Sequence, residues 1–396
     1  MADRLERARA YHAKKSGGAI ARFFQAPGRV NLLGEHTDYS GGFCMPAALN
    51  FNTLVVASPR ADQVLRLHSM DYDETVEVPL EALEGWRTGE GAGHWSAYPA
   101  GVAWSLGERG IEVHGAELTL QGDVPPGAGL SSSASVEVAV ATALLELAGV
   151  SLPKPPVALA CQRAENDYVG APCGIMDQFI SAAGVRGNAL AIDTRALTAE
   201  LAPIPAGFRL VVCNSMVRHS VGAGEYGQRR LKVEEAAAAI GKLHPAVNQL
   251  RDASLAKLLE ARDTMAFEAF RRGRHVITDS GRVLEGLEAL RAGDVQRFGA
   301  LMTAAHVSFR DDFAASCPEC DLLVDLALRL EGCVGSRLTG GGFGGCTVSL
   351  VEAEAASGFA EALGHAYERR AKVVPQVFVC EVSDGAGEVS GFEGKI

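Results

Sequence analysis

The stretch Pro125-Pro126-Gly127-Ala128-Gly129-Leu130-Ser131-Ser132-Ser133-Ala134-Ser135 joins a strand predicted over 116–121 to a long apolar helix predicted over 130–148. Glycine permits the positive φ angles that turn backbone N–H groups inward, and a helix N-terminus adds partial positive charge. Serine hydroxyls can also donate to phosphate or bind Mg²⁺, so the junction is typical of a phosphate-binding loop. It is not a P-loop, because the lysine of G-x-x-x-x-G-K-[ST] is absent. Taken alone, the stretch is equally compatible with serines that only cap the helix.

A second motif, Gly28-Arg29-Val30-Asn31-Leu32-Leu33-Gly34-Glu35-His36-Thr37-Asp38-Tyr39, belongs to a polar stretch that follows an apolar strand predicted over 22–26. Burying so many hydrogen-bonding groups is costly unless they bind a ligand or one another. Glu35, His36 and Asp38 could bind a polyol, while Arg29 could stabilise charge on a transferring phosphoryl group. A metal site is the other functional interpretation. A solvated turn with an Arg–Glu ion pair is disfavoured, because the apolar residues within the motif require burial.

A third motif, Gly170-Ala171-Pro172-Cys173-Gly174-Ile175-Met176-Asp177-Gln178-Phe179, places one carboxylate after a turn rich in Gly and Pro. Asp177 could accept a proton from a hydroxyl, or orient that hydroxyl, if a substrate lies within hydrogen-bond distance. Considered alone, an acidic residue in the first turn of a helix is more simply explained by the helix dipole. Glu165, on the preceding helical segment, is either a surface charge or a single-carboxylate Mg²⁺ ligand.

A fourth motif, Gly335-Ser336-Arg337-Leu338-Thr339-Gly340-Gly341-Gly342-Phe343-Gly344-Gly345-Cys346, has five glycines in six residues between two predicted strands. A glycine hinge or a tight hairpin would explain it in structural terms. The large loss of chain entropy instead suggests that phosphates or a neighbouring loop approach the backbone closely.

The length of 396 residues predicts two packed domains with a cleft between them. Short strand-like segments dominate residues 22–78, whereas amphipathic helices dominate residues 225–330 before strands return over 334–382. This mixture predicts an α+β fold. We place the boundary near residue 200, which divides the chain into a first domain, 1–200, and a second, 201–396.

Composition excludes several classes of protein. No apolar stretch approaches the roughly 20 residues that span a bilayer, and the net charge of -11 argues against a general nucleic-acid surface. The N-terminus carries mixed charge and no apolar segment like that of a secretory signal. Nine cysteines form no disulfide framework, and Cys317-Pro-Glu-Cys320 lacks the partners of a zinc site. We therefore expect a cytoplasmic protein with reduced thiols.

The four motifs, in this order, resemble those of the GHMP kinases, the family of galactokinase, homoserine kinase, mevalonate kinase and phosphomevalonate kinase. Within that family, residues 28–39 closely resemble the galactokinase signature, which narrows the substrate class to a sugar. The resemblance covers nearly the whole chain. It implies an N-terminal domain like that of ribosomal protein S5, a ferredoxin-like C-terminal domain, and an active site between them.

The resemblance also implies roles for individual residues. Asp177 matches the catalytic carboxylate, and Arg29 matches the residue that stabilises the reacting hydroxyl and phosphate. Glu165 and a loop serine, Ser132, match Mg²⁺ ligands. Residues that match groups in contact with galactose are Glu35, His36, Asp38, Gly174 and Tyr226. Residues that match the ATP site are Trp95 beside adenine and, in the phosphate loop, Gly127, Gly129, Ser131, Ser132 and Ser133.

The activity implied by the resemblance is phosphorylation of the anomeric hydroxyl of galactose, with ATP and Mg²⁺ as cofactors. An N-acetylgalactosamine kinase is one alternative, and would need room for an acetamido group. A galactose- and ATP-binding regulator of transcription without turnover is another, although the intact Asp177 and Arg29 favour catalysis. We expect a monomer that binds neither nucleic acid nor membrane.

Overall fold

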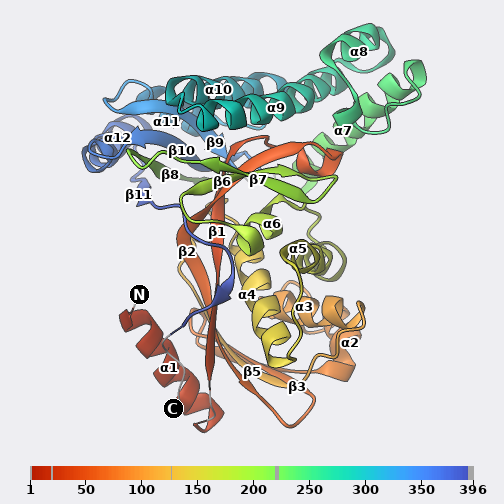
Figure 1. The fold of residues 1–396 in the computed structure, drawn as a ribbon, viewed down its shortest axis with the longest axis vertical. Helices are drawn as coiled ribbons and strands as arrows, with labels where there is room; N and C mark the ends of the chain where they lie inside the picture. The colour runs from red at the N-terminus through yellow and green to blue at the C-terminus, as the bar shows by residue number, and fades with distance from the viewer. Residues whose placement is uncertain (1, 19–20, 126, 219–222, 391–396) are drawn as a thin grey trace.

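The computed structural model describes residues 2–18, 21–125, 127–218 and 223–390, and it has two β-sheets, each covered by helices (Figure 1). The first sheet is built mainly from the first half of the chain, and the second only from residues after 207. Sheets and helices are segregated in the manner of an α+β protein. The predicted fold class is therefore confirmed.

The first sheet has the strand order β12-β1-β2-β5-β3-β4, and β6 and β7 extend from β2. Neighbouring strands are antiparallel except for β3 and β5, which are parallel. The last strand of the chain returns to pair with the first. The strands are β1 (Arg22–Leu33), β2 (Phe43–Pro59), β3 (Val64–Ser69), β4 (Glu74–Pro79), β5 (Ala116–Gly122), β6 (Asn188–Asp193), β7 (Thr198–Pro203) and β12 (Gly387–Glu388).

Helices cover both faces of this sheet because its strands alternate in side-chain direction. Phe24 and Val55 face a core shared with α4 and its neighbouring helices. Phe23 and Val56 face the opposite way, toward α1. The helices are α1 (Ala2–Ser16), α2 (Leu83–Thr88), α3 (Ala97–Gly107), α4 (Ser132–Leu147), α5 (Lys154–Arg163), a π-helix (Ala164–Val169) and α6 (Met176–Ala183).

The second sheet is antiparallel, with the order β11-β8-β10-β9. On β8, Val212 packs with α9 and α10, whereas Val211 packs with α11 and α12 on the other face. Its strands are β8 (Phe208–Arg218), β9 (Cys333–Thr339), β10 (Gly344–Glu352) and β11 (Gln376–Cys380). The helices of this half are α7 (Ala223–Leu243), α8 (Leu255–Glu260), α9 (Phe267–Arg291), α10 (Val295–Ser308), a π-helix (Phe309–Phe313), α11 (Pro318–Ala327) and α12 (Ala356–Ala371).

One expectation about the second motif is wrong. The polar stretch does not simply follow a strand, because β1 continues through Leu33 and pairs with β2 along most of the motif. The register shifts between Pro27 and Arg29 and again between Asn31 and Leu33. Such bulges re-aim side chains at the end of a strand, which is how polar residues occur in an otherwise buried strand.

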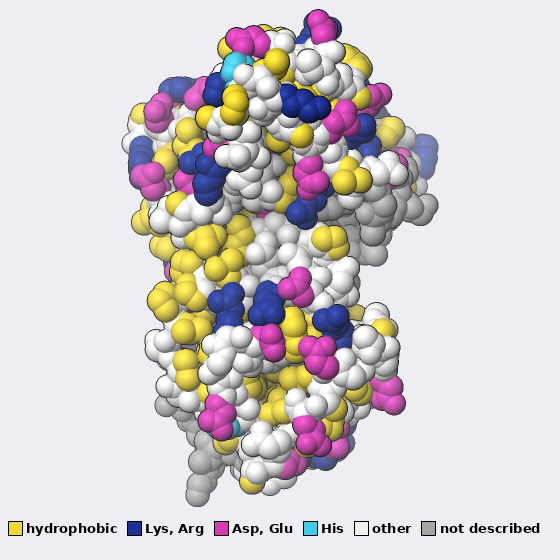
Figure 2. Space-filling view, turned by 90° about the vertical axis from the view of Figure 1, so that its right-hand side faces the viewer, with side chains coloured by type: hydrophobic (Ala, Val, Ile, Leu, Met, Phe, Trp, Pro, Cys, Tyr) yellow, Lys and Arg dark blue, Asp and Glu magenta, His cyan; other side chains and the backbone are white. Residues whose placement is uncertain are grey.

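On the face seen in Figure 2, positive and negative side chains are interspersed, with no broad area of one sign. No helix within the described ranges is long and apolar enough to cross a membrane.

Candidate active site

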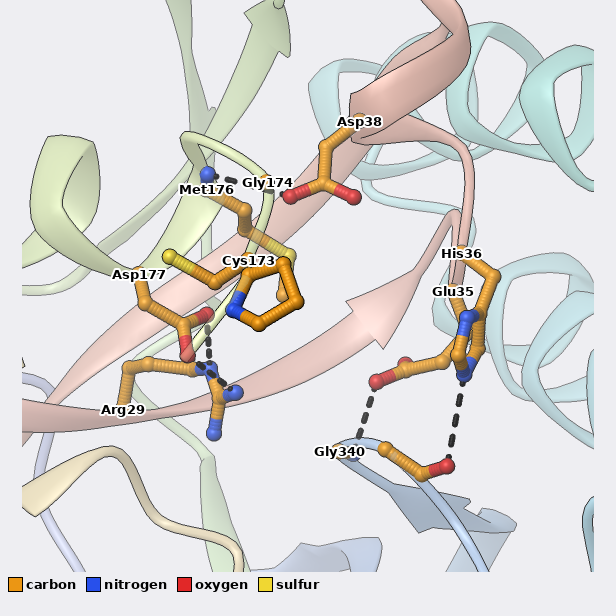
Figure 3. A pocket seen from close by; sticks show the side chains of 11 residues that line it. Arg29, Glu35, His36, Asp38, Cys173, Gly174, Met176, Asp177 and Gly340 are labelled. Carbon is orange, nitrogen blue, oxygen red and sulfur yellow. Dashed lines mark hydrogen bonds and ion pairs between the residues drawn. The ribbon is translucent and has the colours of Figure 1, made fainter. Parts of the chain in front are cut away.

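A pocket of about 170 Å³ lies where three segments meet: the end of β1 with the loop after it, the start of α6, and the glycine-rich loop between β9 and β10 (Figure 3). These segments are far apart in sequence, and the second and third motifs provide opposite walls. The lining residues are Arg29, Glu35, His36, Asp38, Pro172, Cys173, Gly174, Met176, Asp177, Gly340 and Gly341.

Arg29 and Asp177 form a bidentate ion pair at one side of this pocket (Figure 3). Arg29 Nε donates to Asp177 Oδ1 at 2.8 Å and Nη2 donates to Oδ2 at 2.7 Å. The Ser131 hydroxyl also donates to Asp177 Oδ2. Although burial opposes the charge on Arg29, the Asp177 and Glu35 carboxylates outweigh burial and raise its pKa. The pair therefore brings a fixed cation and a partly exposed carboxylate together.

The predicted phosphate loop packs against the glycine-rich loop backbone to backbone. A Cβ at Gly340 would lie 2.9 Å from the Gly129 carbonyl oxygen, and one at Gly345 would lie 3.0 Å from that of Ala128. Arg29 joins the same junction, since its Nη1 donates to the Gly129 oxygen at 2.5 Å. Close approach by a neighbouring loop therefore explains part of the glycine cluster. Gly127 and Gly129 themselves are exposed, at positive φ.

Glu35 is 2% exposed, and three groups bind its carboxylate. Asn31 Nδ2 donates to Oε2 and the Gly340 N–H donates to Oε1, each at 2.7 Å. Arg337 Nη2 lies 3.1 Å from Oε2. Burial raises the pKa of Glu35, and Arg337 and Arg29 oppose that rise. The carboxylate is thereby held in one orientation at the wall of the pocket.

The residue types alone did not identify Arg337 or Asp279 as parts of the site. Arg337 is fully buried on β9 and lies 3.9 Å from Asp279, which is also fully buried. Asp279 Oδ2 accepts the backbone N–H groups of Gly34 and Glu35, both at 2.9 Å. A charged residue within the apolar strand 334–338 was the one available signal for Arg337.

His36 sits in a pocket of aromatic rings. Its ring centroid lies 4.4 Å from that of Phe313 and 5.7 Å from that of Phe309. His36 Nε2 donates to the Gly341 carbonyl at 3.3 Å, and the hydroxyl of Tyr39 donates to Nδ1 at 3.1 Å. Burial, together with the nearby His275, lowers the pKa of His36 to about 3, so the ring is neutral at physiological pH.

The Asp38 carboxylate lies against the backbone at Gly174, in the third motif. Its Oδ2 accepts the N–H of Met176 at 3.3 Å, and its Oδ1 accepts that of Tyr39 at 3.1 Å. Burial and the nearby Asp177 raise the pKa of Asp38 to about 6. A Cβ at position 174 would lie 1.8 Å from Asp38 Oδ2, so only glycine leaves room for this carboxylate.

Glu165 lies on the π-helix between α5 and α6, and its carboxylate is almost fully buried. The Ser133 hydroxyl lies beside this carboxylate and favours its charged form. Gln178 Nε2 donates to Glu165 Oε2 at 2.6 Å, and Cys173 Sγ donates to the same oxygen at 3.4 Å. Burial raises the pKa of Glu165. Local π-helices are frequent at functional sites because the extra residue changes where side chains point.

Trp95 is one of the predicted site residues that do not line this pocket. Trp95 stacks on Tyr72 with ring centroids 6.4 Å apart, and its indole N–H donates to Glu74 at 2.7 Å. The backbone of Tyr226 lies on α7, but its side chain is outside the described part of the structure. The pocket does bring together Arg29, Glu35, His36, Asp38, Gly174 and Asp177.

The arrangement suits a polyol substrate next to an anion. The carboxylates that line the pocket can accept hydrogen bonds from hydroxyls, and backbone N–H groups can donate to them. Arg29 and the N-terminus of α4 supply positive potential, and Asp177 supplies a carboxylate that can accept a proton. In the described ranges, no group of three or more His, Cys, Asp or Glu side chains could hold a metal ion by itself.

Comparisons with known proteins agree with this chemistry. Three family profiles match: "Galactokinase galactose-binding signature" over residues 10–59, "GHMP kinases N terminal domain" over 97–185, and "GHMP kinases C terminal" over 287–369. A galactokinase of Roseiflexus sp. is 42% identical over 365 residues, which is 92% of each chain. A galactokinase of Streptomyces coelicolor is 45% identical over 367 residues, which is 91% of this chain and 92% of that one.

Among solved structures, the crystal structure of Lactococcus lactis galactokinase complexed with galactose superposes with a TM-score of 0.92. That chain is 30% identical to this one, and the alignment covers 97% of this chain and 100% of that chain. A mevalonate kinase structure, 18% identical, superposes with a TM-score of 0.63 over 91% of this chain and 99% of that chain, which shows a shared fold.

Proposed function

The chain belongs to the galactokinases, a branch of the GHMP kinase family, and from this membership we propose how its residues carry out the reaction. The enzyme transfers the γ-phosphate of ATP to the anomeric hydroxyl, O1, of galactose. One observation carries the proposed roles. Arg29 and Ser131 hold the Asp177 carboxylate at the border between the pocket and the phosphate loop.

In the proposed mechanism, Asp177 orients the O1 hydroxyl and accepts its proton as O1 attacks the γ-phosphorus. The O1–phosphorus bond forms while the bond to the β-phosphate oxygen breaks, and ADP leaves. Arg29 offsets the negative charge that develops on the phosphoryl oxygens. Since little covalent chemistry falls to the protein, positioning and electrostatic stabilisation provide most of the rate enhancement.

The galactose site is proposed on the walls of the pocket. Glu35 and Asp38 would accept hydrogen bonds from sugar hydroxyls, and the neutral His36 and the backbone at Gly174 would complete the recognition. We propose Tyr226 as a further contact. The support for these roles is that the first four residues line one pocket with Asp177.

The ATP phosphates are proposed to bind at Gly127, Gly129 and Ser131 to Ser133, where exposed glycines precede the N-terminus of α4. Trp95 would lie beside adenine. Glu165 would hold Mg²⁺ with a loop serine, and the Ser133 hydroxyl that contacts Glu165 supports Ser133 in this role alongside Ser132. One carboxylate and one hydroxyl fit Mg²⁺, which keeps several waters and binds substrate phosphates. When bound, Mg²⁺ would neutralise charge on the phosphates.

We propose that the chain divides near residue 200 into residues 1–200 and 201–396, since β8, the first strand of the second sheet, begins at Phe208. We also propose a cytoplasmic monomer. Nine free cysteines among the described residues are compatible with a reducing compartment.

The proposed function is tested by phosphorylation of galactose, N-acetylgalactosamine, glucose and mevalonate side by side with MgATP, with each product identified by NMR. We expect galactose 1-phosphate to form far faster than any other product. Preference for N-acetylgalactosamine would contradict the substrate assignment. Binding of galactose and ATP without turnover would contradict catalysis.

Replacing Gly174 with Ala is expected to weaken galactose binding, because the new Cβ would displace the Asp38 carboxylate from its place 1.8 Å away. Overpacking of this kind costs about 1–3 kcal/mol, which is about 5- to 150-fold in Kd where the cost falls on the galactose complex. Calorimetric titration with galactose measures the change. Gly281→Ala on α9 is the matched control, since among the described residues no atom beyond its chain neighbours and its own helix backbone lies within 4 Å of the new Cβ. Equal galactose affinity in both variants would contradict the proposed role of Asp38.

Galactose affinity is expected to fall as the pH drops below about 6, the raised pKa of Asp38. Protonation removes an acceptor, so the affinity should fall by up to about tenfold per pH unit. The effect on folding runs in the opposite direction. Because the pKa of Asp38 is raised in the folded protein, the stability that its protonated carboxyl contributes is fully present below the usual pKa of 3.8. That contribution is lost as the pH rises through about 6. Calorimetric titrations from pH 5 to 8 test the binding effect. The Asp38→Asn variant should lose the part of the profile centred near pH 6, and an unchanged profile would contradict the prediction.

A further inference from the structure

Glu137 is a carboxylic acid that the mechanism above does not use, and it is completely buried beneath the phosphate loop. It lies on α4, four residues after Ser133, so the two side chains share one face of the helix about one turn apart. Carboxyl groups are almost never fully buried unless they are paired. Its position in the apolar core beside the proposed nucleotide site therefore requires an explanation.

The partner of Glu137 is Gln178, the neighbour of Asp177 on α6. Gln178 is also completely buried, and its Nε2 donates to Glu137 Oε2 at 3.1 Å and to Glu165 Oε2 at 2.6 Å. An amide nitrogen has two hydrogens, so one serves each carboxylate. Because carboxylates only accept, this pairing also fixes which end of the amide faces them. Glu137 thus holds Gln178, and Gln178 holds Glu165.

The chain of contacts ends at the proposed metal ligands. The Ser133 hydroxyl lies beside the Glu165 carboxylate and favours its charged form. Residues from α4, the π-helix and α6 therefore converge in one buried network that runs from Glu137 through Gln178 and Glu165 to Ser133. Groups that orient a metal ligand affect metal affinity even though they never touch the ion.

We propose that Glu137 is a positioning residue for the phosphoryl transfer: through the Gln178 amide it orients the Glu165 carboxylate toward Ser133 and so sets the affinity for the divalent cation bound with the nucleotide. This inference rests on the proposed role of Glu165 as a metal ligand. On this inference the length of the Glu137 side chain, rather than its charge, determines the affinity for the cation.

Two conservative variants separate the effect of side-chain length from the effect of charge. Glu137→Asp keeps the carboxylate but shortens the side chain by one methylene, so the contact with Gln178 is lost. Glu137→Gln keeps the length and an acceptor for Gln178 Nε2 while it removes the charge. Its new amide also adds an N–H donor at a place where Glu137 Oε1 and Gln178 Oε1 have no hydrogen-bond partner within the described residues.

The experiment titrates each full-length variant with Mn²⁺ in the presence of ADP and measures free Mn²⁺ by electron paramagnetic resonance. Galactose affinity is measured in parallel by calorimetry. For Glu137→Asp we expect the Mn²⁺ Kd to rise about tenfold, and for Glu137→Gln to stay within about threefold of the parent. Galactose affinity should be unchanged in both. Ser135→Ala is the matched control, since it removes buried hydrogen bonds to Ala26 and Thr53 elsewhere on α4. It should lower thermal stability without changing the Mn²⁺ Kd.

Unchanged Mn²⁺ binding in Glu137→Asp would overturn the inference, as would a loss in Glu137→Gln as large as that in Glu137→Asp. An equal loss of galactose affinity would overturn it too, because it would indicate general structural damage. Glu165→Gln separates this failure from failure of the proposed metal site. If Glu165→Gln weakens Mn²⁺ binding and Glu137→Asp does not, only the positioning role is wrong. If Glu165→Gln has no effect, the metal site itself is wrong.

Discussion

Replacing Asp177 with Asn is expected to lower kcat by about 10²- to 10⁴-fold, the usual contribution of a general base. The variant loses the group that accepts the O1 proton, whereas the residues proposed to bind galactose stay in place. The galactose KM should therefore change little, which is the signature of an interaction made mainly in the transition state. Initial rates at saturating MgATP over a range of galactose concentrations measure both constants. Turnover equal to that of the parent would contradict the proposed role.

A second variant at this position tells a base from an orienting group. Asn can still accept a hydrogen bond from the Ser131 hydroxyl and from one nitrogen of Arg29, whereas Ala can accept none. If Asp177 mainly orients the hydroxyl, Asp177→Asn should retain far more activity than Asp177→Ala. If it removes the proton, both variants should be similarly inactive. Circular dichroism must accompany these rates, because either change leaves the buried guanidinium of Arg29 with a weaker partner.

Local sequence chemistry predicted the parts of the fold that depend on neighbouring residues. The helix expected over 130–148 is α4, Ser132–Leu147, because an apolar run after Gly and Ser is a strong helix start. The strand expected over 22–26 was too short, because β1 continues through Leu33 with bulges that carry polar residues. Alternation of residue types is weak where a strand bulges and both of its faces are buried, so its true end was hidden.

Contacts between distant segments could not be predicted from residue types. The motifs indicated that Arg29 and Asp177 belong to the site. Nothing in the sequence shows that these two residues, 148 positions apart, form one ion pair. Arg337 was quoted only as part of a glycine-rich motif, although the structure places it against Glu35. The network around Glu137 was missed altogether, because an isolated acid in an apolar helix gives no local signal of its partner. Such pairings depend on tertiary packing.

Replacing Arg337 with Met is expected to destabilise the protein by about 3–5 kcal/mol, the cost of leaving a buried charge without its partner. Arg337 is fully buried, 3.1 Å from Glu35 and 3.9 Å from Asp279. Its Nε and Nη1 also donate to the carbonyls of Leu338 and Leu32, at 2.8 and 3.3 Å. Met fills a similar volume but leaves the Glu35 carboxylate without its cation. Urea unfolding measures the loss.

A second substitution separates the loss of stability in Arg337→Met from its loss of galactose affinity. Asp279 keeps a cation in Arg282, 3.1 Å away, so most of the uncompensated charge in Arg337→Met falls on Glu35. The double variant Arg337→Met, Glu35→Gln should therefore regain part of the lost stability, because the Glu35 carboxylate is no longer present without its cation. It should not regain galactose affinity, because the proposed acceptor for a sugar hydroxyl is gone as well. A double variant as unstable as the single one would show that the loss comes from packing or from the backbone carbonyls, and that Arg337 does not act through Glu35.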